Sequence, residues 1–156
     1  MIEFLFEDCN NKKGKHITKN NYWKRNGITV DRSHRLIVGD YMLDLDAKIS
    51  VDTKQNIFEL AQDFFCDKTR FEAECMRAKA NGITLIFLIE EQCDKQKLLQ
   101  WRSPTNVKGK RFINIYGWQI YKEMQRYAKL FNVKFRFCHK LSTGRIIIEL
   151  LTQKTD

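Results

Sequence analysis

The sequence predicts an α/β fold with three layers, in which a central mixed β-sheet is flanked by α-helices. Three observations predict this class. Several short segments of β-type pattern occur within residues 2–54, two helical patterns follow over 55–81, and the unbroken apolar run "ITLIFLIEE" then fits a central strand covered on both faces. At 156 residues the chain has the length of about one domain, so residues 1–156 are expected to fold as a single unit.

The first third of the chain is expected to contain strands and one short helix. "IEFLFE" has the pattern of a buried first strand. Thr18 is expected to cap a helix that Gly27 ends. Three consecutive strands of a meander should follow, with turns at residues 33–34 and around 44–46; these are "ITVDR", "RLIVGDYML" and "AKISVDTK".

Apolar residues at helical spacing define the remaining elements. They predict two helices after residue 54, marked by Ile57, Leu60, Ala61 and Phe64 and then by Phe71, Cys75 and Ala78, with Gly82 as the stop. Residues 92–110 are expected to form a loop or short helix. A long helix with an apolar face from Phe112 to Phe131, the strand "VKFRFC" and a last helix from Ser142 or Thr143 complete the domain.

The charge balance favours a polyanionic partner. The chain has 28 Lys and Arg against 19 Asp and Glu, a net charge of +9 and a pI near 9.4, which makes a nucleic acid the leading candidate partner; the alternative is that the charge only keeps the protein soluble. The basic residues are dispersed over several segments, as on a folded surface. The start of the chain is too short and acidic for a signal peptide and no apolar run is long enough to span a bilayer, so an intracellular, cytoplasmic protein is expected. Five widely spaced cysteines without a CxxC pair argue against disulfides and zinc.

An acidic run, "VGDYMLDLDAKISVDTK", is the main candidate for chemistry. Asp52 and Lys54 lie two residues apart on a predicted strand and should therefore share a face. A hairpin would bring Asp40 opposite Asp52, and two carboxylates with a backbone carbonyl form an oxygen-rich site suited to Mg²⁺. Such an acid-acid-lysine set is the one that PD-(D/E)xK nucleases use. The alternative is ordinary turn and surface chemistry, which we assign to Asp44 and Asp46.

The wider context of this run resembles the nuclease domain of the XPF family, within the restriction-endonuclease-like fold. "RLIVGDYML", "ISVDTKQNIFELAQDF" and "KTRFEAECMRAKANGITLIFLIEE" match that pattern in order and spacing. The match is strongest over residues 1–91, and residues 92–156 would complete the same domain. The "GKH" and "TGRIIIELL" segments are most similar to compact bacterial and phage members.

The resemblance implies a role for individual residues. Asp40 and Asp52 match metal ligands, Lys54 matches the catalytic lysine, and Asp8 in "FEDCNNKKGKH" matches an additional or indirect metal ligand. Arg70 matches a phosphate-binding arginine; its alternative is a surface ion pair with Glu74. The implied cofactor is Mg²⁺, for which Mn²⁺ should substitute. Asp52→Ala and Lys54→Ala are expected to abolish cleavage and to leave folding largely intact.

Several positions depart from the family pattern. Thr53 replaces an arginine, Asn10 and Asn11 stand where an arginine and a glutamate are usual, and Phe58 replaces an acid, with Glu59 expected to face away from the site. The leading hypothesis is a metal-dependent endonuclease for branched, flap or junction DNA in recombination or repair. The alternatives are a non-catalytic DNA-binding or partner subunit and, more remotely, a protein-interaction module.

Two further features bear on the partners. No helix-hairpin-helix module follows residue 91, so branch recognition would need the domain surface, a homodimer or a partner nuclease subunit. Aromatic residues beside basic ones could stack on exposed bases; these are Tyr22, Trp23 and Trp101. Each is also a candidate core residue.

Overall fold

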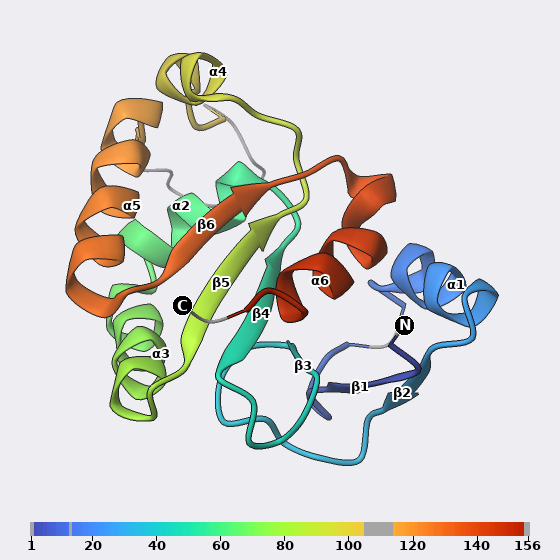
Figure 1. Ribbon diagram of the computed structural model, residues 1–156. Helices are drawn as coiled ribbons and strands as arrows, with labels where there is room; N and C mark the ends of the chain where they lie inside the picture. The colour runs from blue at the N-terminus through green and yellow to red at the C-terminus, as the bar shows by residue number, and fades with distance from the viewer. Residues whose placement is uncertain (1, 13, 105–113, 155–156) are drawn as a thin grey trace.

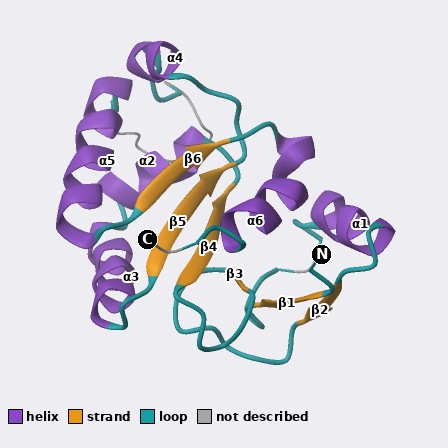
Figure 2. Cartoon of the chain, in the orientation of Figure 1, coloured by secondary structure: helices purple, strands orange, loops and turns teal. Residues whose placement is uncertain are grey.

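The computed structural model describes residues 2–12, 14–104 and 114–154, and within these ranges one mixed sheet of six strands has helices on both faces (Figures 1 and 2). The strands are β1 (Phe4–Glu7), β2 (Thr29–Asp31), β3 (Tyr41–Met42), β4 (Ile49–Lys54), β5 (Thr84–Ile89) and β6 (Lys134–Phe137). The helices are α1 (Ile17–Arg25), α2 (Ile57–Phe65), α3 (Lys68–Ala80), α4 (Lys95–Gln100), α5 (Gly117–Phe131) and α6 (Thr143–Leu151). The predicted α/β class with a mixed sheet is confirmed.

The sheet order is β2-β1-β3-β4-β5-β6. Strands β4, β5 and β6 run parallel, whereas β3 is antiparallel to both of its neighbours, β1 and β4. Strand β5 lies between β4 and β6, as its continuous apolar sequence predicts for a strand covered on both faces. The register pairs Asp52 with Phe87 and Lys54 with Ile89, which places the acid-x-lysine segment beside the middle of the core.

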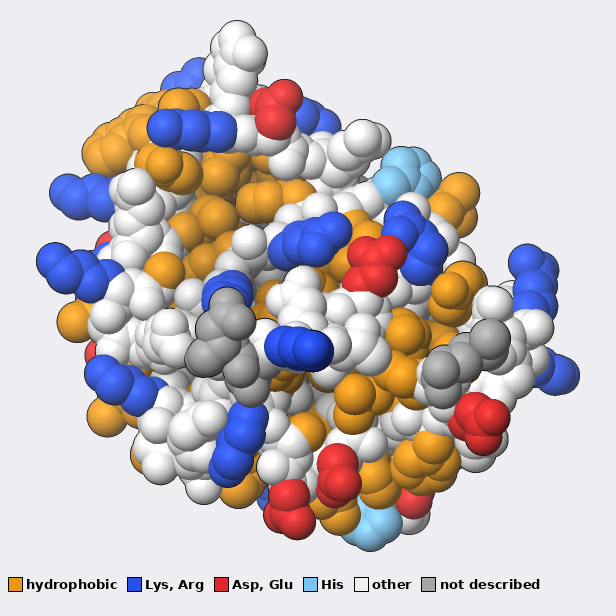
Figure 3. Space-filling view, in the orientation of Figure 1, with side chains coloured by type: hydrophobic (Ala, Val, Ile, Leu, Met, Phe, Trp, Pro, Cys, Tyr) orange, Lys and Arg blue, Asp and Glu red, His pale blue; other side chains and the backbone are white. Residues whose placement is uncertain are grey.

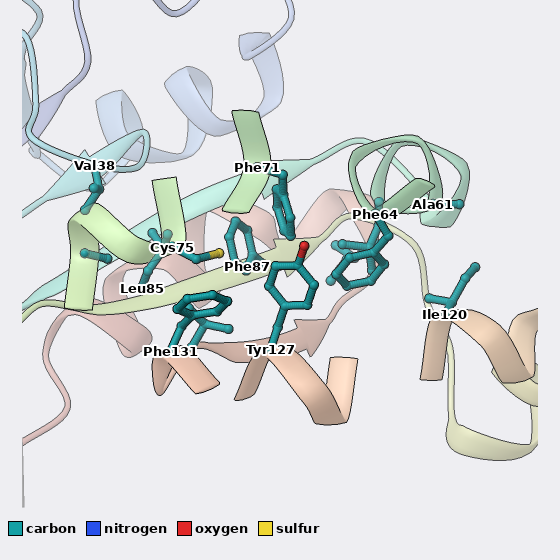
Figure 4. Packing of buried hydrophobic residues seen from close by; sticks show 14 of the residues in the cluster. Val38, Ala61, Phe64, Phe71, Cys75, Leu85, Phe87, Ile120, Tyr127 and Phe131 are labelled. Atoms are coloured by element: carbon teal, nitrogen blue, oxygen red, sulfur yellow. The ribbon is translucent and has the colours of Figure 1, made fainter. Parts of the chain in front are cut away.

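Alternation along the strands divides the core into two layers. Leu85, Phe87 and Ile89 of β5 face a cluster with α2, α3 and α5, whereas Ile86 and Leu88 face a cluster with α1 and α6. Figure 4 shows the first cluster, in which aromatic rings pack closely; Phe71 and Phe87 have centroids 4.8 Å apart. Asp52 and Lys54 lie on this aromatic side of the sheet, because Val51 and Ile49 face the other cluster.

The predicted meander is confirmed for β3 and β4, which pair antiparallel, and wrong for β2. Strand β2 lies at the edge of the sheet and pairs in parallel with β1, and only Tyr41 and Met42 of the segment "RLIVGDYML" form a strand. Residues 35–40 run as a loop that still buries Leu36 and Val38. Side chains replace a strand partner there, since Leu36 N donates to Asp8 Oδ1 and the Ile37 carbonyl accepts from Arg77 Nε.

Other boundaries follow the sequence more closely. Helices α2 and α3 bury the residues that their periodicity predicts, α4 lies in the segment expected to be a loop or short helix, and α6 begins at Thr143. The first helix begins at Ile17 after His16, so Thr18 is not its cap. The expected helix face from Phe112 lies partly outside the described residues, and α5 starts at Gly117.

Gly39 is required where the loop crosses β4. Its φ is +73°, and a Cβ built on it would lie 2.2 Å from Ser50 Oγ and 3.1 Å from the Val51 carbonyl oxygen. Ser50 Oγ itself donates to the Val38 carbonyl at 2.7 Å, so it is not free to move away. The loop can therefore approach β4 only because this position lacks a side chain.

We expect Gly39→Ala to lower the free energy of unfolding by about 2–4 kcal/mol, from backbone strain together with the clash. Gly82→Ala is a matched control, because Gly82 has a φ of +65° but nothing within 4 Å of its built Cβ. Urea unfolding of both variants separates the two contributions. Equal losses in the two variants would mean that the close approach to Ser50 costs nothing.

One face of the molecule carries its positive charge in a dispersed form. On the face shown in Figure 3, Lys and Arg side chains are spread over the surface rather than gathered in one patch. None of the helices in the described ranges is long and apolar enough to cross a bilayer.

Candidate active site

Asp40, Asp52 and Lys54 meet at one cavity of about 480 Å³. Asp52 and Lys54 project from the same side of β4, and the loop that ends at Asp40 is tied to β4 by the Asp40 N–H, which donates to the Val51 carbonyl at 2.8 Å. A second hollow of about 430 Å³ shares these three side chains and adds Asp8 and Glu74. The predicted acid-acid-lysine set is therefore assembled in space.

Thr53 fixes the Asp40 carboxylate. Its backbone N–H and its hydroxyl each donate to Asp40 Oδ2 at 2.9 Å. Burial and the neighbouring Asp52 carboxylate nevertheless raise the pKa of Asp40 well above its ordinary value. Two carboxylates held this close are unfavourable unless a cation accompanies them. Thr53 therefore holds one of the two carboxylates in place.

Thr53→Val tests this support, because it removes the hydroxyl donor and keeps the backbone donor and the side-chain shape. For the endonuclease activity that the sequence predicts, we expect a cleavage rate about tenfold lower, with the free energy of unfolding changed by no more than about 1 kcal/mol. Thr53→Ser should retain the wild-type rate, since it keeps the hydroxyl. Equal rates for Thr53→Val and Thr53→Ser would show that the hydroxyl does not position Asp40.

Lys54 is buried between two carboxylates. Its Nζ lies 3.0 Å from Asp52 Oδ1 and 2.8 Å from Asp63 Oδ2, and it sits 5.6 Å from the ring centroids of Phe71 and Phe87. Burial by itself lowers the pKa of an ammonium group, but the two carboxylates outweigh it and the pKa of Lys54 is raised. Lys54 therefore remains protonated and can act as a fixed cation rather than as a base.

The structure adds two acidic residues that the sequence analysis missed. Asp63 of α2 is 4% exposed and pairs with Lys54, while Glu74 of α3 accepts from the Gly39 N–H at 3.2 Å. Burial and the Asp52 charge raise the pKa of Glu74 to about 7. Both residues share a helix face with buried apolar residues. The sequence contained a signal for them, because an acidic residue on the apolar face of a predicted helix is expected to be buried and to need a charged or hydrogen-bonding partner.

Asp8 is engaged in backbone contacts. Its Oδ1 accepts from Leu36 N at 2.7 Å, its Oδ2 accepts from Asn10 N at 3.1 Å, and its own N–H donates to the Asp40 carbonyl at 2.8 Å. It thereby places the loop that carries Asp40. A direct role for Asp8 as a metal ligand stays a prediction.

Arg70 lies at the cavity with a free guanidinium face. Its side chain is 76% exposed, with Nη2 3.5 Å from Asp63 Oδ1 and 3.8 Å from Asp67 Oδ2. The alternative ion pair with Glu74 is wrong, because Glu74 turns toward Gly39 instead. Contact of Arg70 with a phosphate stays a prediction.

The positions that depart from the family pattern differ in their location. Asn10, Asn11 and Glu59 line the cavity, so the expectation that Glu59 faces away is wrong. The Glu59 carboxylate accepts from Gln55 N at 2.9 Å and closes the first turn of α2. Phe58 is half-buried on the same helix. The acid that contacts Lys54 is Asp63, further along α2.

The residues considered for base stacking are covered by the fold. Trp23 is 0% exposed and donates from Nε1 to the Gly144 carbonyl, so stacking by Trp23 is excluded. Tyr22 and Trp101 are half-buried against the two core clusters. Their interpretation as core residues is the one that the structure supports.

His16 forms one wall of the cavity, and its Nδ1 lies 3.3 Å from the Tyr41 hydroxyl. Burial, followed by the charges of Lys19, Lys15 and Arg32, lowers the pKa of His16 to about 4. In the unfolded chain the imidazole titrates near 6.5. Between these two values the unfolded chain binds a proton that the native protein does not, so stability falls as the pH falls.

We expect protonation of His16 in the unfolded chain to lower the free energy of unfolding by about 1 kcal/mol between pH 6.5 and pH 4, a size that allows for solvent screening at this partly exposed ring. His16→Gln should remove it. Urea unfolding of the wild type and of His16→Gln at several pH values gives the difference between their free energies of unfolding. A difference that does not change between pH 4 and pH 7 would contradict the lowered pKa.

The donor set at Asp40 and Asp52 fits a hard divalent cation. Mg²⁺ binds through one or two carboxylates and retains several waters, and the mutual repulsion of this pair is what such an ion offsets. Among the described residues, no three His, Cys, Asp or Glu side chains are placed to ligate one ion. The structure therefore brings Asp40 and Asp52 together and leaves Asp8 outside a common three-ligand group.

Comparison with known proteins identifies the fold. No family model and no curated protein matches the sequence. The structure is similar to XPF from Aeropyrum pernix, with a TM-score of 0.66, 15% identity and coverage of 95% of this chain. A second match is XPF from Aeropyrum pernix in complex with DNA, with a TM-score of 0.64, 14% identity and 96% coverage. The chain spans 63% of the length of each solved chain. The predicted resemblance to XPF is confirmed at the level of the fold.

Proposed function

We propose that this protein is a metal-dependent DNA endonuclease. The observation that carries the proposal is the meeting of Asp40, Asp52 and Lys54 at one cavity, on a fold shared with XPF, one solved example of which is bound to DNA. The net charge of +9 agrees with a polyanionic substrate.

Each residue has a defined part in the proposed reaction. Asp40 and Asp52 would hold Mg²⁺, with Asp8 as a further candidate ligand. When bound, the ion lowers the pKa of a water and offsets charge on the scissile phosphate. Lys54 supplies a fixed positive charge beside that phosphate, where charge increases during hydrolysis. Arg70, with its exposed guanidinium, binds a phosphate of the same strand.

Asp63 and Thr53 act through other residues. Asp63 holds Lys54 by the 2.8 Å ion pair, and Thr53 holds Asp40 by two hydrogen bonds. Both are positioning residues, because their polar atoms are directed at other side chains of the site. The expected substrate is branched, flap or junction DNA in an intracellular setting.

A panel of labelled DNAs tests the proposal. Duplex, single-stranded, flap, fork and four-way-junction DNAs are incubated with the protein in Mg²⁺, Mn²⁺ or EDTA. We expect cleavage in both metals, none in EDTA, and none with Asp52→Asn. Asp44→Asn is the matched control, because Asp44 belongs to the same acidic run but lies exposed in a turn.

The outcomes separate the proposed functions. Cleavage that Asp52→Asn removes and Asp44→Asn retains supports the nuclease. Salt-sensitive DNA binding without cleavage in either metal would overturn it and would favour a partner subunit. Cleavage that survives Asp52→Asn would place the chemistry elsewhere on the molecule.

A further inference from the structure

A separate cavity of about 610 Å³ adjoins the catalytic one. It lies between α1 and the edge of the sheet formed by β1 and β2. His16 lines both cavities and separates them. Because the two cavities share His16, a nucleotide that follows one bound near Asp40 along the same strand is the natural candidate to occupy the second cavity.

The lining combines an apolar floor with a few polar groups. Trp23, Ile28 and Val30 form the apolar part. At the polar end, Glu7 is 3% exposed, and the Arg32 guanidinium lies 3.5 Å from Glu7 Oε2 and donates to Asn20 Oδ1 at 2.8 Å. Few, well-placed polar groups on an apolar surface are typical of pockets that bind a flat organic ligand.

Helix α1 sets this cavity in a fixed relation to the catalytic one. His16, Asn20 and Lys24 are spaced by four residues, so they lie on one side of α1 and line the cavity together. Lys19 instead forms a buried ion pair with Glu90, the residue that follows β5. Glu90 also lines the catalytic cavity. The ion pair thus fixes α1, which forms one wall of this cavity, to the end of β5 beside the catalytic cavity.

We propose that the 610 Å³ cavity beside α1, called the base cavity below, receives one unpaired base of the DNA strand being cut. The proposal rests on the nuclease function proposed above and names its substrate more closely. The base would lie against Ile28 and Val30, with its hydrogen-bonding edge toward Asn20 and Glu7 and its phosphate near Lys24 and Arg32. A paired base must first be unstacked and unpaired at a cost of a few kcal/mol, whereas an unpaired base enters without that cost. The cavity therefore favours DNA with an unpaired nucleotide beside the cleavage site.

The test uses 2-aminopurine, a fluorescent base, placed in turn at each unpaired position near the branch of a flap DNA. Asp52→Asn protein keeps the DNA intact. We expect the fluorescence to change at one position or two consecutive positions. Adding Asn20→Leu should abolish that change and weaken binding to the flap DNA about tenfold, with binding to paired duplex unchanged. Asn21→Leu is the matched control, because Asn21 is exposed on the same helix outside the cavity.

A second measurement does not depend on a protein variant. An abasic site at the responding position should weaken flap binding by the same factor of about ten. The proposal is overturned if no position responds, if the abasic site has no effect, or if Asn21→Leu loses as much as Asn20→Leu. Cleavage of the same DNAs by the wild-type protein is measured separately. Cutting without a position-specific response would overturn only the base cavity, and a response without cutting would overturn only the nuclease.

Discussion

Lys54→Met should lower the free energy of unfolding by about 3–5 kcal/mol at neutral pH. The substitution keeps the length of the side chain but leaves Asp52 and Asp63 as uncompensated charges, at positions where they lay 3.0 and 2.8 Å from the ammonium. It also removes the cation from beside the Phe71 and Phe87 rings. The expectation that loss of Lys54 leaves folding intact is therefore replaced by a prediction of coupled loss of stability and activity. Urea unfolding in EDTA measures the effect.

Two companion variants identify the cause. Lys122→Met on α5 removes an exposed lysine and should change stability by less than about 0.5 kcal/mol. Lys54→Met combined with Asp63→Asn should recover about 1–2 kcal/mol, because one of the two stranded carboxylates is gone. The loss in Lys54→Met should also shrink at acid pH, where the carboxylates become neutral. A double variant no more stable than Lys54→Met would mean that packing, not charge, is lost.

Asp40→Asn should reduce cleavage on the order of 10³-fold without reducing stability. The amide oxygen can still accept the two hydrogen bonds from Thr53, while the repulsion between Asp40 and Asp52 disappears. In EDTA at pH 8 we expect this variant to be at least as stable as the wild type, by about 0–1 kcal/mol. Activity and stability would thus change in opposite directions.

Thermal unfolding in the presence of Mg²⁺ completes that comparison. Binding of the ion to the native state alone should raise the unfolding temperature of the wild type, and Asp40→Asn should lose most of this increase. Asp46→Asn, from the exposed turn of the same acidic run, should behave as the wild type. An unaltered cleavage rate, or a lower stability in EDTA, would contradict the assigned role of Asp40.

The parts of the site that were predictable depend on short-range periodicity. A strand places Asp52 and Lys54 on one face whatever surrounds it, and the long apolar run of β5 can only be buried on both sides. A predicted hairpin brought Asp40 opposite Asp52, and the resemblance to XPF added its expected role as a metal ligand. These features were available without any knowledge of the sheet order.

The parts that were missed depend on contacts between elements. Asp63 reaches Lys54 only because α2 packs across the end of β4, and nothing in the spacing of the two residues requires it. The pairing of β2 with β1 was missed because residues 35–40 satisfy their backbone groups with side chains of distant elements, such as Asp8 and Arg77. The strand propensity of a segment carries no information about hydrogen-bond partners from distant parts of the chain.

The position of Lys54 inside the aromatic core has a consequence for how related sequences should be interpreted. A lysine that compensates two buried carboxylates is retained by selection for folding alone, even in a protein that no longer cuts DNA. Asp40 is different, since its charge opposes that of Asp52 and the fold would tolerate its loss. Under the proposed nuclease function, Asp40 rather than Lys54 is therefore the residue whose presence separates a sequence that cleaves DNA from one that only folds.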